Sequence, residues 1–140
     1  MLLHVIARGR IGRGPEADLV ERYRARMSWP FRITELPDKG GRVPPPTGDC
    51  RTVALDERGE SLASTVLAER LGRWRDDGVR EARFLIGAAD GHNADTREGA
   101  DLLISFGKAT WPHLMVRAML AEQLYRATSI LAGHPYHREG

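Results

Sequence analysis

Short strand-like runs alternate with helix-like stretches along the whole of this chain. In a globular domain, this alternation predicts a mostly parallel sheet with helices on both of its faces, so the expected fold class is α/β. The first run is apolar apart from His4, whereas the second alternates apolar and polar residues as a half-buried strand does. The predicted strands are residues 2–7, 31–36, 52–55, 84–86 and 102–106.

Proline and glycine mark the ends of the predicted helices. Proline fits the first turn of a helix, and glycine adopts the left-handed conformation that often ends one. Residues 37–50 contain four prolines and three glycines and are therefore expected to form a loop. The helix signals are Pro15 and Pro30 for the first helix, a capping Ser61 and Gly78 for the second, residues 95–100 for a short third, and Pro112 and Gly133 for the last.

At 140 residues, the chain is expected to form one domain, residues 1–140, with a real hydrophobic core. Cys50 is its only cysteine, and the amino terminus lacks the pattern of a secretory signal, so a cytoplasmic location is expected. No apolar run is long enough to cross a bilayer, so no membrane association is expected. Only Lys39 and Lys108 among the 21 basic residues are lysines. Arginine suits phosphate contacts, although a codon bias explains its excess equally well.

Ligands of parallel α/β sheets bind beyond the carboxyl ends of the strands. Three segments of this chain fall there, namely residues 55–59, 87–92 and 106–111. The second segment begins with Gly87, where the absence of a side chain allows close backbone approach to a ligand. It matches neither the dinucleotide-binding motif nor the phosphate-loop motif, so a tight turn is the simpler interpretation of this segment alone.

The last helix is apolar on most sides but carries Glu122 and Arg126, which are four residues apart in the favourable order for an ion pair. Charges on a buried helix need partners, so we expect this pair at an interface or in a pocket. His113 lies at the start of the helix, where the positive helix end favours a neutral imidazole that can accept a proton. A structural role for His113 is an equally good interpretation.

The chain ends in a tail that contains His134, Tyr136, His137 and Arg138. No companion set of cysteines or histidines accompanies these residues, so no metal site is expected. No serine lies in a G-x-S-x-G nucleophile motif either. Such tails are often disordered, but Pro135 and Tyr136 suit a tail that packs onto another surface.

Five motifs stand out: Leu55-Asp56, Ile86-Gly87, Thr110-x-Pro112-His113, Glu122-Gln123-Leu124-Tyr125-Arg126-Ala127 and Pro135-Tyr136-His137-Arg138. Together they resemble the ribosomal RNA large subunit methyltransferase H family, of the SPOUT class. The resemblance is strong from Leu55 to the carboxyl end and recognisable over residues 2–36. The spacing between the last two motifs is its most specific feature.

The resemblance implies a single SPOUT methyltransferase domain whose carboxyl-terminal part threads a deep trefoil knot. It also implies a homodimer, the cofactor S-adenosylmethionine (SAM), and N3 methylation of a pseudouridine in 23S ribosomal RNA of the large subunit. These implied binding residues fall in the three strand-end segments described above. Carried over by position, they are Leu55, Gly87, Phe106, Gly107, Lys108, Ala109, Thr110 and Trp111.

The resemblance further implies that the tail of one protomer lies near the pocket of the other. The N3–H of pseudouridine is a weak acid, so a neutral histidine or a tyrosine network could accept its proton during methyl transfer. Cationic side chains could stabilise the negative charge that develops on the flanking carbonyl oxygens. The candidate catalytic residues are His113, Tyr136, His137 and Arg138, with Glu122 and Arg126 orienting them or holding the dimer.

The chain departs from the family pattern in three places. Ala88 follows Gly87 where a second glycine is usual, and this small change is expected to leave the pocket intact. Gly107 stands where serine is common, which could alter one cofactor hydrogen bond. A loop around residues 43–49 replaces a helix, so RNA contacts of that helix are in doubt. The alternative functions are a SPOUT-like methyltransferase with an altered RNA target and a non-catalytic RNA-binding module.

Overall fold

The computed structural model describes residues 1–88 and 91–138. Within them, strands and helices alternate as the sequence predicts. None of the helices in this part of the chain has the length and apolar character needed to span a membrane. The elements are β1 (Leu2–Arg8), α1 (Pro15–Arg26), β2 (Phe31–Leu36), β3 (Cys50–Glu60), α2 (Ser64–Asp76), β4 (Glu81–Ile86), α3 (Ala94–Gly99), β5 (Leu102–Ile104) and α4 (His113–Leu131).

The five strands form one sheet in the order β2-β1-β4-β3-β5, and every neighbouring pair is parallel. The predicted parallel α/β fold is therefore confirmed. Because the strands are parallel, all of their carboxyl ends meet at the same edge of the sheet. The loops that follow β1, β3, β4 and β5 leave from this edge, which is where the sequence places its candidate binding segments.

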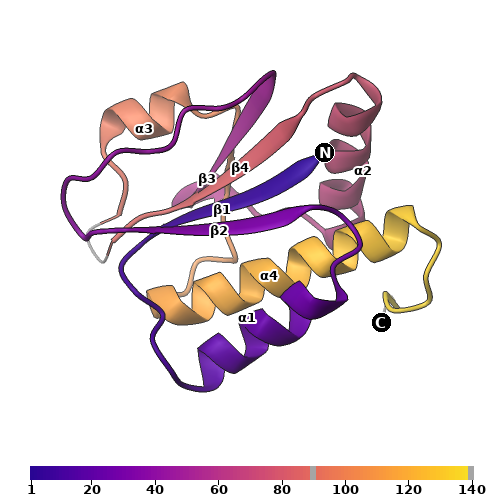
Figure 1. Cartoon of the computed structure of the whole chain (residues 1–140), viewed down its shortest axis with the longest axis horizontal. Coiled ribbons are helices and arrows are strands. Elements are labelled where there is room, and N and C mark those ends of the chain that lie inside the picture. Colours follow the sequence, from indigo (N-terminus) through magenta and orange to yellow (C-terminus); the bar gives the residue numbers. More distant parts are fainter. Residues whose placement is uncertain (89–90, 139–140) are drawn as a thin grey trace.

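One face of the sheet carries the main hydrophobic core. Strand residues such as Leu3, Val53 and Phe84 pack there against α2 and α4, and Leu120 and Leu124 of α4 are fully buried. Each large apolar side chain buried in this way contributes about 1.5–3 kcal/mol. α1 lies beside α4 on this side of the sheet (Figure 1), where a smaller buried cluster joins the two helices.

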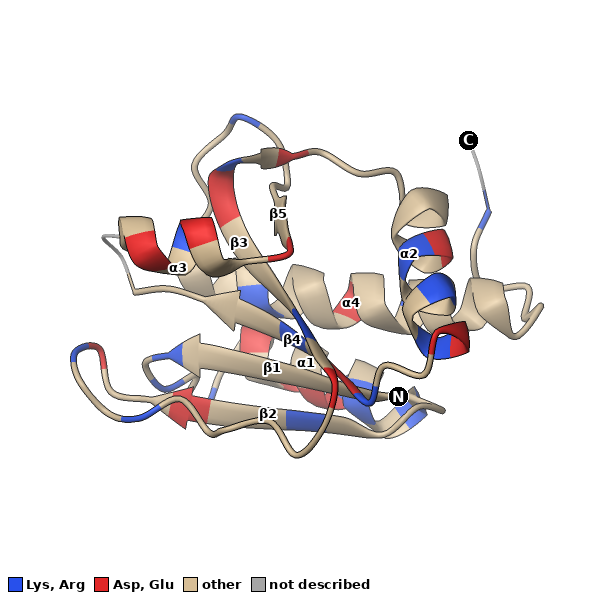
Figure 2. Cartoon of the chain, turned by 90° about the horizontal axis from the view of Figure 1, so that it is seen from above, with Lys and Arg blue, Asp and Glu red and all other residues tan. Residues whose placement is uncertain are grey.

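The opposite face carries a buried polar cluster and lies under residues 37–49 and the short α3 (Figures 1 and 2). His4 lies at its centre, with Nδ1 2.8 Å from Glu81 Oε2 and Nε2 2.7 Å from Thr34 Oγ1. The Arg83 guanidinium donates to the same Glu81 oxygen at 2.6 Å. Burial lowers the pKa of His4, and Glu81 only partly offsets this effect. Burial alone would raise the pKa of Glu81, but hydrogen bonds from Arg83 and His4 hold it below its ordinary value.

Five predicted boundaries are wrong by two residues or more. β3 begins at Cys50 instead of Thr52, and β4 begins at Glu81 instead of Phe84. β3 continues to Glu60 instead of ending at Leu55, and β5 ends at Ile104 instead of Phe106. Helix α2 begins at Ser64 with Ala63 at its N-cap position, so Ser61 does not cap it. The predicted ends of α4 are confirmed to within a residue, because Pro112 occupies the N-cap and Gly133 follows the C-cap with φ of +71°.

The extension of β3 wraps around the end of β5. Ile104 pairs with both Leu55 and Glu60, so the residues between them bow outward, and Ser105 donates its N–H to the Glu60 carbonyl at 2.9 Å. Gly59 permits this close approach, because a Cβ built on it would lie 2.6 Å from backbone atoms of Leu103 and Ile104. The wrapped contact lies where the trefoil knot is expected, and the threading itself stays a prediction.

Candidate functional site

Two adjoining cavities open at the carboxyl edge of the sheet, between the ends of β3, β4 and β5 and the start of α4. The smaller has a volume of about 170 Å³ and the larger about 560 Å³. Leu55, Asp56, Thr110 and Trp111 are among the residues that line both. Together the cavities reach the size of sites that bind small molecules, which span about 300–1,000 Å³.

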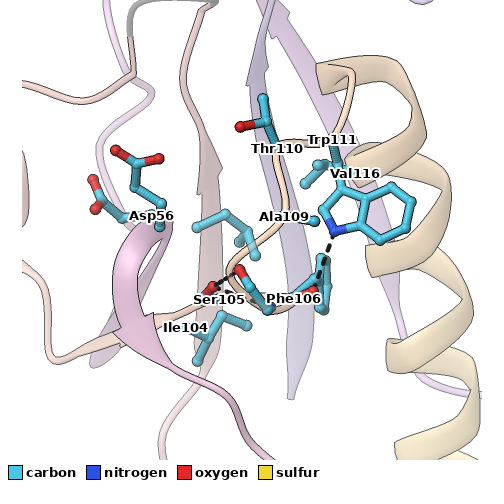
Figure 3. Close-up of a pocket in the computed structure, with 11 residues that line it drawn as sticks. Asp56, Ile104, Ser105, Phe106, Ala109, Thr110, Trp111 and Val116 are labelled. Atoms are coloured by element: carbon cyan, nitrogen blue, oxygen red, sulfur yellow. Dashed lines mark hydrogen bonds between the residues drawn. The ribbon is translucent and has the colours of Figure 1, made fainter.

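The loop between β5 and α4 forms one wall of the smaller cavity (Figure 3). Hydrogen bonds within the loop set its shape. The Ser105 hydroxyl donates to the Gly107 carbonyl at 2.8 Å, and Trp111 Nε1 donates to the Phe106 carbonyl at 3.2 Å. The apolar side chains of Leu55 and Ile104 also line this cavity. Apolar walls beside loop backbone suit a flat heterocycle that needs both stacking and hydrogen bonds.

The larger cavity is more polar. Its lining includes Gly87, His92, Arg97 and the exposed His113 at the start of α4. His92 Nε2 lies 3.0 Å from the Leu85 carbonyl, and Arg97 donates to the His92 carbonyl at 2.6 Å, so these two side chains are fixed in place. The cavity therefore offers imidazole and guanidinium groups to a polar or anionic ligand.

A carboxylate lies between the two cavities. The Asp56 side chain is only 5% exposed and lines both of them. Its Oδ1 accepts the Arg58 N–H at 2.9 Å, and the exposed Arg58 guanidinium lies 3.7 Å away. Because few charges compensate it, this carboxylate would stabilise a cationic ligand group beside it.

The structure brings together seven of the eight predicted cofactor-binding residues. Gly87 lines the larger cavity, whereas Lys108 is exposed and is not among the described residues that line either one. Ala89 and Asp90 of the predicted segment 87–92 lie outside the described residues. The other six predicted residues line the smaller cavity, namely Leu55, Phe106, Gly107, Ala109, Thr110 and Trp111.

Sequence reasoning did not assign a binding role to five of the residues that line the smaller cavity. Asp56 and Glu57 directly follow Leu55 inside the predicted strand-end segment 55–59. Their position in this segment could have identified them as candidate binding residues. Nothing in the sequence indicates that Val116, one turn into α4, faces a cavity. The five residues are Asp56, Glu57, Ile104, Ser105 and Val116.

A second cluster of polar residues lies at the other end of α4. The predicted pair of Glu122 and Arg126 is confirmed, with Arg126 Nη2 2.6 Å from Glu122 Oε1 and both side chains about four-fifths buried. The Tyr136 hydroxyl donates to the same Glu122 oxygen at 3.1 Å, and the Arg126 guanidinium lies over the Tyr136 ring at 4.8 Å. Tyr136 also packs edge-on against Tyr125, with ring centroids 4.7 Å apart. The tail thus folds back onto α4.

The protonation of this cluster follows from its contacts. Burial raises the pKa of Tyr136, and the neighbouring Tyr23 and the Glu122 carboxylate raise it further. Its hydroxyl therefore stays protonated and acts as a hydrogen-bond donor. Arg126 Nη1 lies 3.1 Å from His137 Nδ1, and because arginine only donates, that nitrogen is the acceptor. Arg138 is exposed.

The candidate catalytic residues are not brought together within one chain. His113 lies at the cavity, whereas Tyr136 and His137 contact Glu122 and Arg126 towards the far end of α4. A helix rises 1.5 Å per residue, so His113 and Arg126 are separated by about 20 Å along its axis. Figure 1 shows the tail leaving that far end of the helix.

An apolar groove lies between α1 and α4 and extends from the loop of the smaller cavity towards the polar cluster around Glu122. Its lining begins at Phe106, in the loop of the smaller cavity, and ends at Tyr23 and Glu122, beside the tail. Leu19 and Met115, which also line it, are 36% and 39% exposed. Apolar side chains that line an open groove are typical of surfaces that bind another protein.

The other reactive side chains do not form a second centre. Among the described residues, no group of three or more His, Cys, Asp or Glu side chains is placed to hold a metal ion. Cys50 lies at the start of β3, at the edge of the sheet opposite the cavities. Burial raises the pKa of its thiol, which keeps it protonated and weakly reactive.

Comparison with known proteins agrees with this geometry. Residues 39–137 match the family model described as "Predicted SPOUT methyltransferase". Proteins named "Ribosomal RNA large subunit methyltransferase H" from Novosphingobium aromaticivorans and Rhizorhabdus wittichii are each 72% identical, with all of both chains covered. One of the same name from Rhodospirillum centenum is 47% identical, with 99% of each chain covered.

A solved structure of a probable methylase family protein from Haemophilus influenzae Rd KW20 superposes with a TM-score of 0.63. The match covers 99% of this chain and 70% of that one. Because the two sequences are only 10% identical, it shows a shared fold and nothing more. The family model and the full-length relatives go further, and together they show that this chain belongs to the SPOUT methyltransferase family, in the group named ribosomal RNA large subunit methyltransferase H.

Proposed function

We propose that this protein is a SAM-dependent methyltransferase that acts on N3 of a pseudouridine in 23S ribosomal RNA of the large subunit. The observation that carries the proposal is 72% identity, over the full chain, to proteins named for methyl transfer to large-subunit ribosomal RNA. Those names give the class of substrate. The target nucleotide and the cofactor are expectations from the family resemblance. The expected place of action is the cytoplasm, where ribosomes assemble.

The two adjoining cavities fit SAM in size and in chemistry. Leu55, Ile104 and Phe106 provide apolar walls for the adenine ring, and the backbone of residues 105–110 provides hydrogen-bonding groups for its edges. The Asp56 carboxylate lies where it would stabilise a positive charge. When bound, SAM supplies a methyl group on a positively charged sulfur. The protein then has to orient this group towards the RNA and manage one proton.

The larger cavity is the proposed entrance for the target base. His113 lines it and is exposed, so a neutral imidazole there can accept the N3 proton of pseudouridine. A nearby guanidinium would stabilise the negative charge on the two flanking carbonyl oxygens as the proton leaves. Arg138 is the predicted residue for that role, but its own chain holds it at the far end of α4.

A homodimer would resolve this separation. The apolar groove between α1 and α4 is the proposed contact surface, because its exposed Leu19 and Met115 need cover. In a dimer with two-fold symmetry, the same surface meets itself, and a two-fold axis perpendicular to α4 would make the two α4 helices run in opposite directions. The far end of one α4 then lies near the cavities of the other chain. Tyr136, His137 and Arg138 would thus complete the partner's site.

One structural observation supports an altered RNA target as the alternative. Residues 37–49 form an irregular segment, whereas the family pattern has a helix there. A different surface at this position could select a different RNA. The arginine-rich composition similarly motivates the interpretation as a non-catalytic RNA-binding module.

The decisive experiment combines two measurements. Calorimetry with SAM comes first, because a protein that gives no binding signal is not a SAM-dependent enzyme. Labelled SAM is then added with assembled ribosomes or free large-subunit RNA, each with and without the pseudouridine. We expect label only in pseudouridine-containing RNA. Equal labelling of the uridine control would favour the altered-target alternative, and binding of RNA without SAM binding would favour the non-catalytic one.

A further inference from the structure

We propose that residues 8–14 form an RNA-binding loop in which Arg10 and Arg13 contact phosphates, and that the ion pair of the buried Arg117 and the partly exposed Glu35 positions this loop beside the larger cavity. The inference rests on the proposed function and specifies which part of the protein holds the RNA backbone. It assigns Arg117 and Glu35 as positioning residues and not as catalytic ones.

The loop carries positive charge only. Residues 8–14 contain three arginines, three glycines and no acidic residue. They follow β1 at the same edge of the sheet as the cavities, and basic residues gather in the loops near the ends of β1 and β2 in Figure 2. Clustered arginines of this kind are the usual partners of nucleic-acid phosphates.

Two of the three arginines are available to a ligand. Arg8 is occupied within the protein, because its guanidinium donates to the Pro37 carbonyl at 3.0 Å and also to the Gly40 carbonyl. Arg10 and Arg13 are exposed, and neither forms a hydrogen bond or a salt bridge with another described residue. These two side chains can therefore bind phosphate without breaking an existing contact.

One ion pair, between the buried Arg117 and Glu35, whose side chain is 35% exposed, holds the backbone of the loop. Arg117 is 2% exposed, and its Nη1 lies 2.5 Å from Glu35 Oε2. Its Nη2 donates to the Gly9 carbonyl at 3.1 Å and to the Arg8 carbonyl at 3.4 Å. The same Glu35 oxygen accepts the Ile11 N–H at 2.7 Å. The pair thus fixes the backbone on both sides of Arg10.

The energetics indicate a positioning role. Burying a guanidinium costs much of its hydration, and apolar residues often replace buried ion pairs without loss of stability. Arg117 Nε adds to that cost, because it is buried and has no hydrogen-bond partner within the described residues. This pair forms directed hydrogen bonds to the loop backbone, which apolar side chains could not form.

The loop also lies next to the proposed base-entry site. A Cβ built on Gly9 would lie 3.9 Å from His113 Cε1, so the loop backbone runs close to that imidazole. His113 and Arg117 are four residues apart on α4 and share one face of the helix. One turn of α4 therefore connects the residue that faces the target base to the residue that holds the loop.

The first test is the salt dependence of RNA binding. The double variant Arg10→Gln/Arg13→Gln is titrated with large ribosomal subunits that lack the methyl group, at several salt concentrations. Each phosphate contact removed should lower the slope of log affinity against log salt by about 0.7–0.9, so the double variant should lower it by about 1.4–1.8. Arg73→Gln on α2, which also removes an exposed arginine, should leave the slope unchanged. Wild-type affinity and slope in the double variant would overturn the proposal.

The second test separates positioning from stability. Glu35→Gln and Arg117→Lys should raise the KM for RNA several-fold while the Kd for SAM, measured by calorimetry, stays at the wild-type value. Val79→Ala, a buried core variant, serves as the control for reduced stability and should keep its KM for RNA. If Glu35→Gln lowers the Tm but leaves the KM for RNA unchanged, the pair is only structural and the positioning role is wrong.

The two tests also separate this inference from the proposed function. A wild-type protein that transfers no methyl group would contradict the proposed function, whereas the salt dependence of binding would still test the loop. Conversely, an active wild-type enzyme whose RNA affinity does not depend on Arg10 and Arg13 would contradict the loop alone.

Discussion

The two ends of α4 differ in how their polar groups are arranged. At the first end, His113 is exposed and faces a cavity of about 560 Å³. At the far end, Glu122, Arg126, Tyr136 and His137 are bonded to one another and mostly buried, next to an apolar groove. The first end is an open site that does not contain the predicted tail residues Tyr136, His137 and Arg138, and the second is a hydrogen-bonded cluster away from the two cavities. In the proposed homodimer, each end would be completed by the opposite end of a second chain.

Removing the tail should have the largest effect. Truncation after Gly133 deletes Tyr136, His137 and Arg138, and we expect methyl transfer to fall by at least about 100-fold, the scale of losing acid–base groups. The Kd for SAM should stay near the wild-type value, because the cavities lie at the other end of the helix. Rates come from labelled SAM and the Kd from calorimetry. Full activity in the truncated protein would show that the far end has no part in the chemistry.

The cofactor end can be disturbed separately through Gly59. A Cβ at this position would meet the backbone of β5 at 2.6 Å, so Gly59→Ala should lower the free energy of unfolding by at least about 2 kcal/mol. We also expect the Kd for SAM to rise about tenfold, which corresponds to a loss of about 1.4 kcal/mol of binding free energy. Gly99→Ala adds its methyl group to open space and is the matched control. Equal stability of the two variants would show that the wrapped contact is not tight.

Mixed dimers test whether the two ends act across chains. Ala109→Trp should fill the smaller cavity, so this chain has an intact tail but no usable cavity. The chain truncated after Gly133 has an intact cavity but no tail. When equal amounts are unfolded and refolded together, half of the dimers are mixed and one of their two sites is intact, so about a quarter of the wild-type activity should return. If both ends act within one chain, the mixture stays inactive.

The smallest expected effect is that of Tyr136→Phe. The raised pKa of Tyr136 keeps its hydroxyl protonated, so it orients Glu122 instead of accepting a proton. Losing one hydrogen bond of about 1 kcal/mol predicts a rate lowered about fivefold. The phenylalanine ring of this variant would keep the contacts with Tyr125 and Arg126. A loss as large as that of the truncated protein would mean that the hydroxyl takes part directly in the proton transfer.

Local signals in the sequence predicted much of the fold and of the cofactor end. Apolar runs separated by proline and glycine gave the strands and helices, and parallel strands place their carboxyl ends together whatever their order. The segments containing Leu55, Gly87 and Phe106 were therefore predicted to meet, and they do. The bounds of α4 followed from Pro112 and Gly133 for the same local reasons.

Contacts between distant residues could not be predicted in this way. The charged residues 56–60 look like a loop, and only their pairing with Ile104 makes them part of β3. Glu35 and Arg117 are 82 residues apart, and no periodicity connects them. The contact of the tail residue Tyr136 with Glu122 on the same chain was also hidden, because it depends on the tail folding back onto its own helix.

The polar face of the sheet gives the protein a sensitivity to acid. Burial holds the pKa of His4 below its ordinary value of 6.5. As the pH falls through 6.5, His4 therefore becomes protonated in the unfolded chain while it stays neutral in the folded protein. Stability should therefore begin to decline just below neutrality. A second decline should follow below pH 4.5, where unfolded Glu81 becomes protonated first. The free energy of unfolding can be measured at a series of pH values for the wild type and for His4→Gln. The variant should lack the first decline and keep the second.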